Sequence, residues 1–176
     1  AQSGGDITLE AGEGASTHIA DGGDGGDVVI KGGRAKGLSV NDNAGDVDLE
    51  GGSAYSGYGG NVLLTSGAGT STSSGSLVMR TSNAGVSGIS GAVTIKTGTT
   101  SNGDSGRVSI VTGKSKAGAG GSIRLSVGDG NTGEGGFVAI NAGLTEAAGL
   151  DASGGYISIR TGYSSKTSSG PFMLRT

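Results

Sequence analysis

Residues 91–98 read Gly91-Ala92-Val93-Thr94-Ile95-Lys96-Thr97-Gly98, and this stretch decides the predicted fold. Its aliphatic side chains, Val93 and Ile95, alternate with small or polar ones, which is the period-two pattern of a β-strand with one buried face. The same pattern returns at residues 106–113 and 121–128. A helix is excluded, because it would need apolar residues three and four positions apart and would be destabilised by each internal glycine.

The pattern repeats along the whole chain, with a dominant spacing of fifteen residues between its opening glycines. These glycines are Gly5, Gly26, Gly45, Gly60, Gly75, Gly91, Gly106, Gly121, Gly136, Gly155 and Gly170. The predicted inward pairs are Ile7/Leu9, Val28/Ile30, Val47/Leu49, Val62/Leu64, Leu77/Met79, Val93/Ile95, Val108/Ile110, Ile123/Leu125, Val138/Ile140, Ile157/Ile159 and Phe172/Leu174. Repetition of one short unit is typical of a solenoid. We therefore expect an all-β fold, a right-handed parallel β-solenoid (β-helix) of about eleven coils, with every inward pair buried.

The residues between the predicted strands are small or polar and too few for a crossover helix. Longer spacings place larger loops at 13–25, 34–44 and 144–154. Residues 170–176, which contain the only proline, Pro171, are expected to form a terminal coil. The organisation predicted from these features is a single domain over residues 1–176.

Composition excludes several classes of protein. The 176 residues include 41 glycines, one proline and no cysteine, so a collagen-like Gly-X-Y chain, a disulfide framework and a thiolate site are excluded. No apolar run approaches the roughly 18 residues of a membrane helix, and no strongly basic patch indicates nucleic-acid binding. A chain that begins at Ala1 resembles a mature secreted protein after signal removal, which predicts an extracellular or cell-surface location.

Charge is distributed unevenly along the chain. Residues 1–75 hold ten acidic and three basic side chains, a balance of −7, whereas residues 76–176 hold five acidic and nine basic ones, a balance of +4. Opposite charges at the two ends favour head-to-tail self-association that is sensitive to salt. Lateral contacts through outward apolar side chains are the second possibility, and they would use Val29, Leu63, Val78 and Met173.

No catalytic constellation emerges from the sequence. The only histidine, His18, lies in the first long loop, where a surface role is favoured over a Ser–His–acid site because such a site needs a rigid scaffold. Glycine-rich phosphate loops need a helix to follow the loop, and none is expected. We therefore predict no enzymatic activity, no catalytic residue, no metal site and no organic cofactor.

Two acidic features leave calcium as a lesser alternative. Residues 22–30 fit the nonapeptide Gly-Gly-x-Gly-x-Asp-x-apolar-x and resemble the calcium-binding repeats of secreted bacterial toxins, but the next nine residues do not repeat it. In addition, the residue after the opening glycine is aspartate in three consecutive repeats, with further acids nearby. These side chains are Asp6, Asp27 and Asp46, flanked by Glu10, Asp48 and Glu50. A solvated acidic face is favoured over a bridging cation.

Two binding functions remain open. Ice binding would need a flat, uniform outward face, but charged and long side chains such as Glu10, Lys31 and Arg80 interrupt it. A small sugar-stacking patch could use the few aromatic residues, which are Tyr55, Tyr58, Phe137, Tyr156, Tyr163 and Phe172. Both an ice-binding protein and a carbohydrate-binding adhesin module are kept as alternatives.

The Gly-x-Val-x-Ile-x-Thr-Gly unit, as in residues 91–98, resembles the glycine-rich β-solenoid repeats of microbial surface proteins, found in adhesins, fibres and appendage sheaths. The resemblance covers essentially the whole chain. It implies a non-enzymatic structural rod, a subunit of an extracellular fibre, appendage or surface layer whose partners are copies of itself or other surface proteins. Fold resemblance alone does not determine function.

Overall fold

The computed structural model describes residues 4–20, 22–147 and 152–175, and within these ranges it contains no α-helix and no β-strand. Bends and short turns, such as the one at Ser39–Asn41, interrupt a backbone that is otherwise irregular. The prediction of an all-β fold, a parallel β-solenoid or β-helix, is therefore wrong. The chain has a coil-rich fold.

The chain divides into two units, Ala1–Val93 and Thr94–Thr176, which are described separately. Residues 1–3, 21, 148–151 and 176 lie outside the described part of the chain. The expected processed start at Ala1, parts of the loops at 13–25 and 144–154, and the end of the terminal coil fall among them. The expectation of a single domain over residues 1–176 remains a prediction.

Closed loops are the recurrent local structure in both units. In the first unit the amide of an opening glycine donates a hydrogen bond to the carbonyl oxygen of the glycine that ends the preceding repeat. The bonds are Gly26 N to Gly12 O, 2.9 Å; Gly45 N to Gly33 O, 2.9 Å; Gly60 N to Gly52 O, 2.8 Å; and Gly75 N to Gly67 O, 2.9 Å. The second unit repeats the arrangement from Gly155 N to Gly143 O and from Gly170 N to Gly162 O, both 2.9 Å. We call each such pair of residues a loop base.

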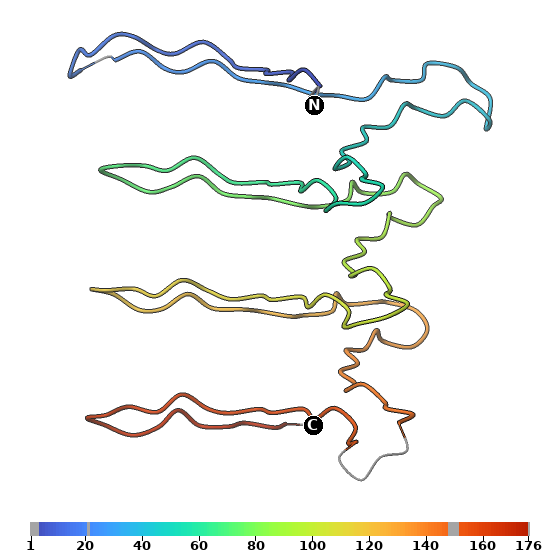
Figure 1. Cartoon of the computed structure of the whole chain (residues 1–176), viewed down its shortest axis with the longest axis vertical. Helices are drawn as coiled ribbons and strands as arrows, with labels where there is room; N and C mark the ends of the chain where they lie inside the picture. The colour runs from blue at the N-terminus through green and yellow to red at the C-terminus, as the bar shows by residue number, and fades with distance from the viewer. Residues whose placement is uncertain (1–3, 21, 148–151, 176) are drawn as a thin grey trace. The chain divides into compact units, whose positions relative to one another are not determined.

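The loop bases reverse the direction of the chain. Figure 1 shows the chain doubling back at the loops 12–26 and 67–75 of the first unit and at the loop 162–170 of the second. The bases at Gly12/Gly26 and Gly33/Gly45 flank residues 13–25 and 34–44, the two longer loops of the first unit. A solenoid instead needs successive repeats to run in the same direction, which loops that close on themselves do not permit.

Close approach of two backbones explains why glycine is needed at the tightest bases. A Cβ atom added to Gly51 would collide with the carbonyl oxygen of Gly60, and one added to Gly32 would collide with the carbonyl oxygen of Gly45. A Cβ on Gly60 would lie 2.9 Å from the amide nitrogen of Gly52, again too close. Glycine is therefore retained here because the opposite limb of the loop occupies the space of a side chain.

The predicted inward pairs do not form a core. No hydrophobic side chain of the described residues is buried, so the expectation that every inward aliphatic is buried is wrong. A trace of the period-two pattern survives: Val62 and Leu64 are 54% and 55% exposed, whereas Leu63 between them is 85% exposed. The alternation therefore places two side chains toward one side of the chain, but no layer of the same chain covers them.

A local competition accounts for the difference from the predicted solenoid. A stacked coil would have to bury its aliphatic pair against distant residues, and this chain offers mostly glycine, serine and alanine for that purpose. Such a thin core offsets little of the conformational entropy that folding removes. A base such as Gly52/Gly60 closes only a short loop, which costs less entropy than contacts between residues far apart in sequence.

Candidate functional site

The first long loop holds His18 in a local turn. The backbone amide of Ala20 donates to His18 Nδ1 over 3.3 Å, and the amide of His18 approaches Ser16 Oγ at 3.5 Å. Both contacts join residues two positions apart, and His18 is exposed. Nδ1 accepts a hydrogen bond here, and Ser16 Oγ faces the backbone of His18 instead of its imidazole. The structure therefore uses His18 to shape a loop and does not bring a serine, the imidazole and a carboxylate together.

Residues 22–26 of the nonapeptide at 22–30 belong to the returning limb of the same loop. The amide of Gly23 donates to the carbonyl oxygen of Ser16 over 3.0 Å, and the amide of Gly26 donates to that of Gly12. Two of its glycines thus serve loop closure, while Asp24 and Asp27 are exposed. Nothing in this arrangement draws the two carboxylates toward a common point.

The acidic side chains of the first three repeats are likewise separate. Asp6, Glu10, Asp46, Asp48 and Glu50 are all exposed. Within residues 4–20, 22–147 and 152–175, no three histidine, cysteine, aspartate or glutamate side chains gather closely enough to hold a metal ion. The structure therefore does not assemble a cation site from these acids, and the expectation of no cofactor stays a prediction.

Two loops contain side-chain hydrogen bonds that the sequence reasoning missed. In the loop 33–45, the amide of Ser39 donates to Asp42 Oδ2 over 2.9 Å, and the amide of Asp42 donates back to the carbonyl oxygen of Ser39 over 3.1 Å. In the loop 162–170, Ser164 Oγ accepts hydrogen bonds from the amides of Lys166 and Thr167 over 3.2 and 3.0 Å. Serine and aspartate at the start of a turn are the signal that could have located both.

A hollow of about 260 Å³ lies at the end of the fifth repeat. It is lined by four consecutive residues, Arg80, Thr81, Ser82 and Asn83, whose side chains carry a guanidinium group, two hydroxyl groups and an amide. This set consists largely of hydrogen-bond donors and suits an anion or a carboxylated sugar. The signal in the sequence is a basic residue followed by threonine, which recurs at Lys96-Thr97 and Arg160-Thr161.

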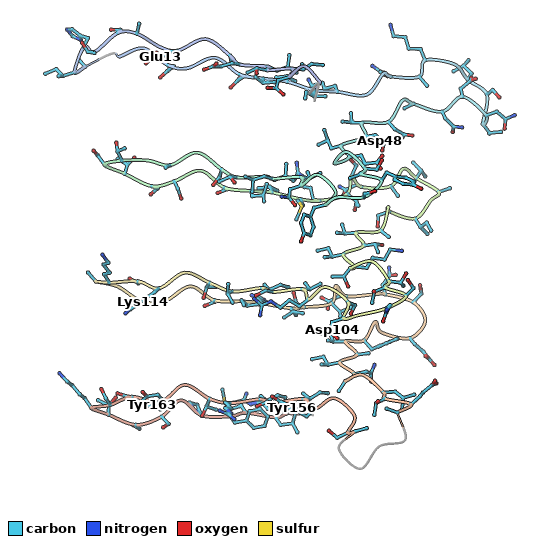
Figure 2. All side chains as sticks on the ribbon, viewed as in Figure 1. Glu13, Asp48, Asp104, Lys114, Tyr156 and Tyr163 are labelled. Atoms are coloured by element: carbon cyan, nitrogen blue, oxygen red, sulfur yellow. The ribbon has the colours of Figure 1, made fainter. Side chains whose placement is uncertain are left out.

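The aromatic residues considered for sugar stacking are all exposed, with Phe172 the least exposed at 64%. In Figure 2, Tyr163 lies toward the loop of its hairpin, whereas Tyr156 lies nearer the other end of the same segment. Tyr55 and Tyr58 belong to the loop 52–60 of the other unit. The structure thus presents single aromatic rings and no stacked pair among those labelled in the figure.

The chain matches no family model, and no curated protein or solved structure is similar to it. In the described part of the chain, no helix has the length and apolar character to cross a membrane.

Proposed function

We propose that this protein is a non-enzymatic structural component, a subunit of an extracellular fibre, appendage or surface layer that assembles with copies of itself. One observation carries the proposal: the aliphatic pair of each repeat, such as Val93/Ile95 or Val108/Ile110, is exposed in the described residues. Large exposed apolar surfaces on soluble proteins mark places where a partner binds. A chain that presents the same apolar pair repeatedly is suited to a partner that repeats as well.

Repetition also gives a physical reason for assembly over a single binding event. Once one repeat has found a partner, the neighbouring repeats are held close to theirs, and their effective concentration rises. Weak individual contacts then add to a stable association, as a fibre or layer requires. The resemblance of the Gly-x-Val-x-Ile-x-Thr-Gly unit to microbial surface repeats supports an extracellular place for such an assembly.

Analytical ultracentrifugation combined with electron microscopy tests this function. We expect the purified chain to sediment as progressively larger species with rising concentration and to appear as filaments or sheets. Val62→Ser together with Leu64→Ser should weaken the association, because it removes one exposed aliphatic pair. The matched control is Val86→Ser together with Ile89→Ser, which removes two exposed aliphatic side chains from outside the repeated pairs and should have less effect. A chain that stays monomeric at high concentration contradicts the proposal.

The hollow beside Arg80 favours one second candidate, a module that binds a carboxylated polysaccharide. The guanidinium fork would pair with a carboxylate, while Thr81, Ser82 and Asn83 would bond sugar hydroxyl groups. Retention of the chain on a polyuronate matrix tests it, with Arg80→Ala expected to elute at lower salt than Arg124→Ala. Equal elution of the two variants would reduce the interaction to net charge.

A further inference from the structure

Among the described residues, the backbone of the aliphatic segments has no backbone partner. All backbone-to-backbone hydrogen bonds of the described residues lie within loops or at loop bases. Residues 46–51 in the first unit and 107–112 in the second take part in none of them. Their amide and carbonyl groups are left for water or for another molecule. Unpaired backbone next to alternating aliphatic side chains is the situation of an open strand edge, which pairs readily with another chain.

The segment at 45–51 shows what such an edge presents. Gly45 and Gly52 belong to two successive loop bases, so both ends of the segment are held by hydrogen-bonded loops. Between them, Val47 and Leu49 alternate with Asp46, Asp48 and Glu50, and all five side chains are exposed. Once this segment is extended, the alternation places the two aliphatic groups on one side and the three carboxylates on the other.

The second unit carries the complementary charge. Residues 1–93 hold ten acidic and four basic side chains, a balance of −6, and residues 94–176 hold five acidic and eight basic ones, a balance of +3. Within its repeats, Lys96, Arg107 and Arg124 occupy positions that alternate with the aliphatic pairs, and all three are exposed. Each of these three repeats thus carries one basic residue, at one of the positions that correspond to 46, 48 and 50.

We propose that the partner of these segments is a second copy of this chain, which pairs its basic second-unit segments with the acidic first-unit segments through backbone hydrogen bonds and so forms β-strands between copies. This proposal rests on the self-assembly proposed above and adds its contact. The two aliphatic pairs meet on one side of the paired strands, and the carboxylates meet lysine and arginine on the other. Cross-strand pairs of opposite charge and of aliphatic side chains both stabilise such strands.

The repeat spacing and the position of the contact favour a second copy over an unrelated partner. Both molecules carry the same dominant spacing of fifteen residues, so pairing at 45–51 brings neighbouring repeats toward matching neighbours. The contact is also heterologous, because it joins the first unit of one molecule to the second unit of the next. A heterologous contact that does not close leaves a free unit at each end and continues as a filament.

Infrared spectroscopy and sedimentation, measured on the same samples, test the proposal. We expect the amide I band of β-strands to appear with concentration at low salt and to diminish as salt is added. Asp46→Asn, Asp48→Asn and Glu50→Gln together should raise the concentration needed for association about tenfold, as expected when several weak exposed ion pairs are lost. The matched control is Glu13→Gln, Asp24→Asn and Asp42→Asn, which removes the same charge from the two long loops and should have less effect.

Charge reversal identifies the contact itself. A chain with Asp46→Lys, Asp48→Lys and Glu50→Lys and a chain with Lys96→Glu, Arg107→Glu and Arg124→Glu should each associate poorly alone. Mixed in equal amounts, they should restore association and the β-strand band. Failure of the mixture overturns the proposed pairing, as does wild-type assembly without new strands. A wild-type chain that never associates overturns the proposed function as well, which keeps the two failures distinct.

Discussion

The loops of this chain are of two kinds, although copies of the same repeat flank all of them. Six bases are joined by a backbone hydrogen bond, and the residue before the first base glycine is Ala11, Gly32, Gly51, Ser66, Ala142 or Thr161. Four other loops, which end at Gly91, Gly106, Gly121 and Gly136, have no such bond between described residues. In these loops the residue at the position of Ala11 or Gly32 is Thr81, Thr97, Thr112 or Val127. The first kind lies toward the two ends of the sequence, and the second occupies its middle.

The difference teaches what a single side chain does to a loop base. A Cβ added to Gly121 would lie 3.2 Å from the Cβ of Thr112, and one added to Gly136 would lie 2.5 Å from Val127 Cγ1. The β-branched side chain of Thr112 or Val127 thus occupies the space that the backbone of the opposite limb occupies at a hydrogen-bonded base. Thr161 precedes a hydrogen-bonded base all the same, so branching at Cβ favours the second kind without enforcing it.

The largest effect is expected when a hydrogen-bonded base receives a methyl group. In Gly51→Ala, the new Cβ collides with the carbonyl oxygen of Gly60, so the base opens and the bond from Gly60 N to Gly52 O is lost. A backbone hydrogen bond contributes about 0.5–1.5 kcal/mol, so amide exchange at Gly60 should accelerate up to roughly tenfold. Gly52→Ala is the control, because open space surrounds its added Cβ. Equal exchange in both variants would contradict the role of close approach.

An effect of similar size is expected in a loop of the second kind that uses left-handed backbone. Gly133 has a φ of 76°, a conformation in which a side chain costs about 1–2 kcal/mol. Gly133→Ala should therefore lower the population of this turn about fivefold or more, measured by the three-bond HN–Hα coupling of residue 133. The control is Gly88→Ala. Like Gly133, Gly88 lies three residues before the glycine that closes its loop, but its φ is not positive and the nearest atom to an added Cβ is 3.9 Å away. This substitution should therefore change the turn little.

The smallest effect is expected from converting one kind of base into the other. Thr112→Gly removes the side chain beside Gly121 and should let Gly121 N donate to Gly113 O, as at the hydrogen-bonded bases. One exposed hydrogen bond would slow amide exchange at Gly121 by a few-fold, about 0.5–1 kcal/mol. Thr112→Val keeps the branched shape and loses only the 3.4 Å contact from Oγ1 to Gly121 O, so it should leave exchange unchanged. Protection gained in Thr112→Val would show that the hydroxyl, and not the shape, separates the two kinds.

Local features of the chain were accessible to sequence reasoning. Glycines such as Gly45 and Gly60 are the fixed points of the repeat, and the structure uses them as loop bases. The tendency of Val62 and Leu64 to share one side persists in their lower exposure relative to Leu63. The turn around Asp42 and the hollow at Arg80 were not predicted, because their signals, serine with aspartate and arginine with threonine, are short and common.

Spacing alone determined where this chain turns and which side chains alternate, because both follow from the backbone geometry of a few neighbouring residues. It did not determine what those side chains meet. Burial of Val93 or Ile110 needs a surface contributed by residues distant in sequence, and the same repeat is compatible with stacking, with closed loops or with pairing between molecules. In the tertiary structure the chain forms loops closed by short-range hydrogen bonds. Closing such loops costs little chain entropy, whereas a stacked layer of glycine and serine would bury little apolar surface.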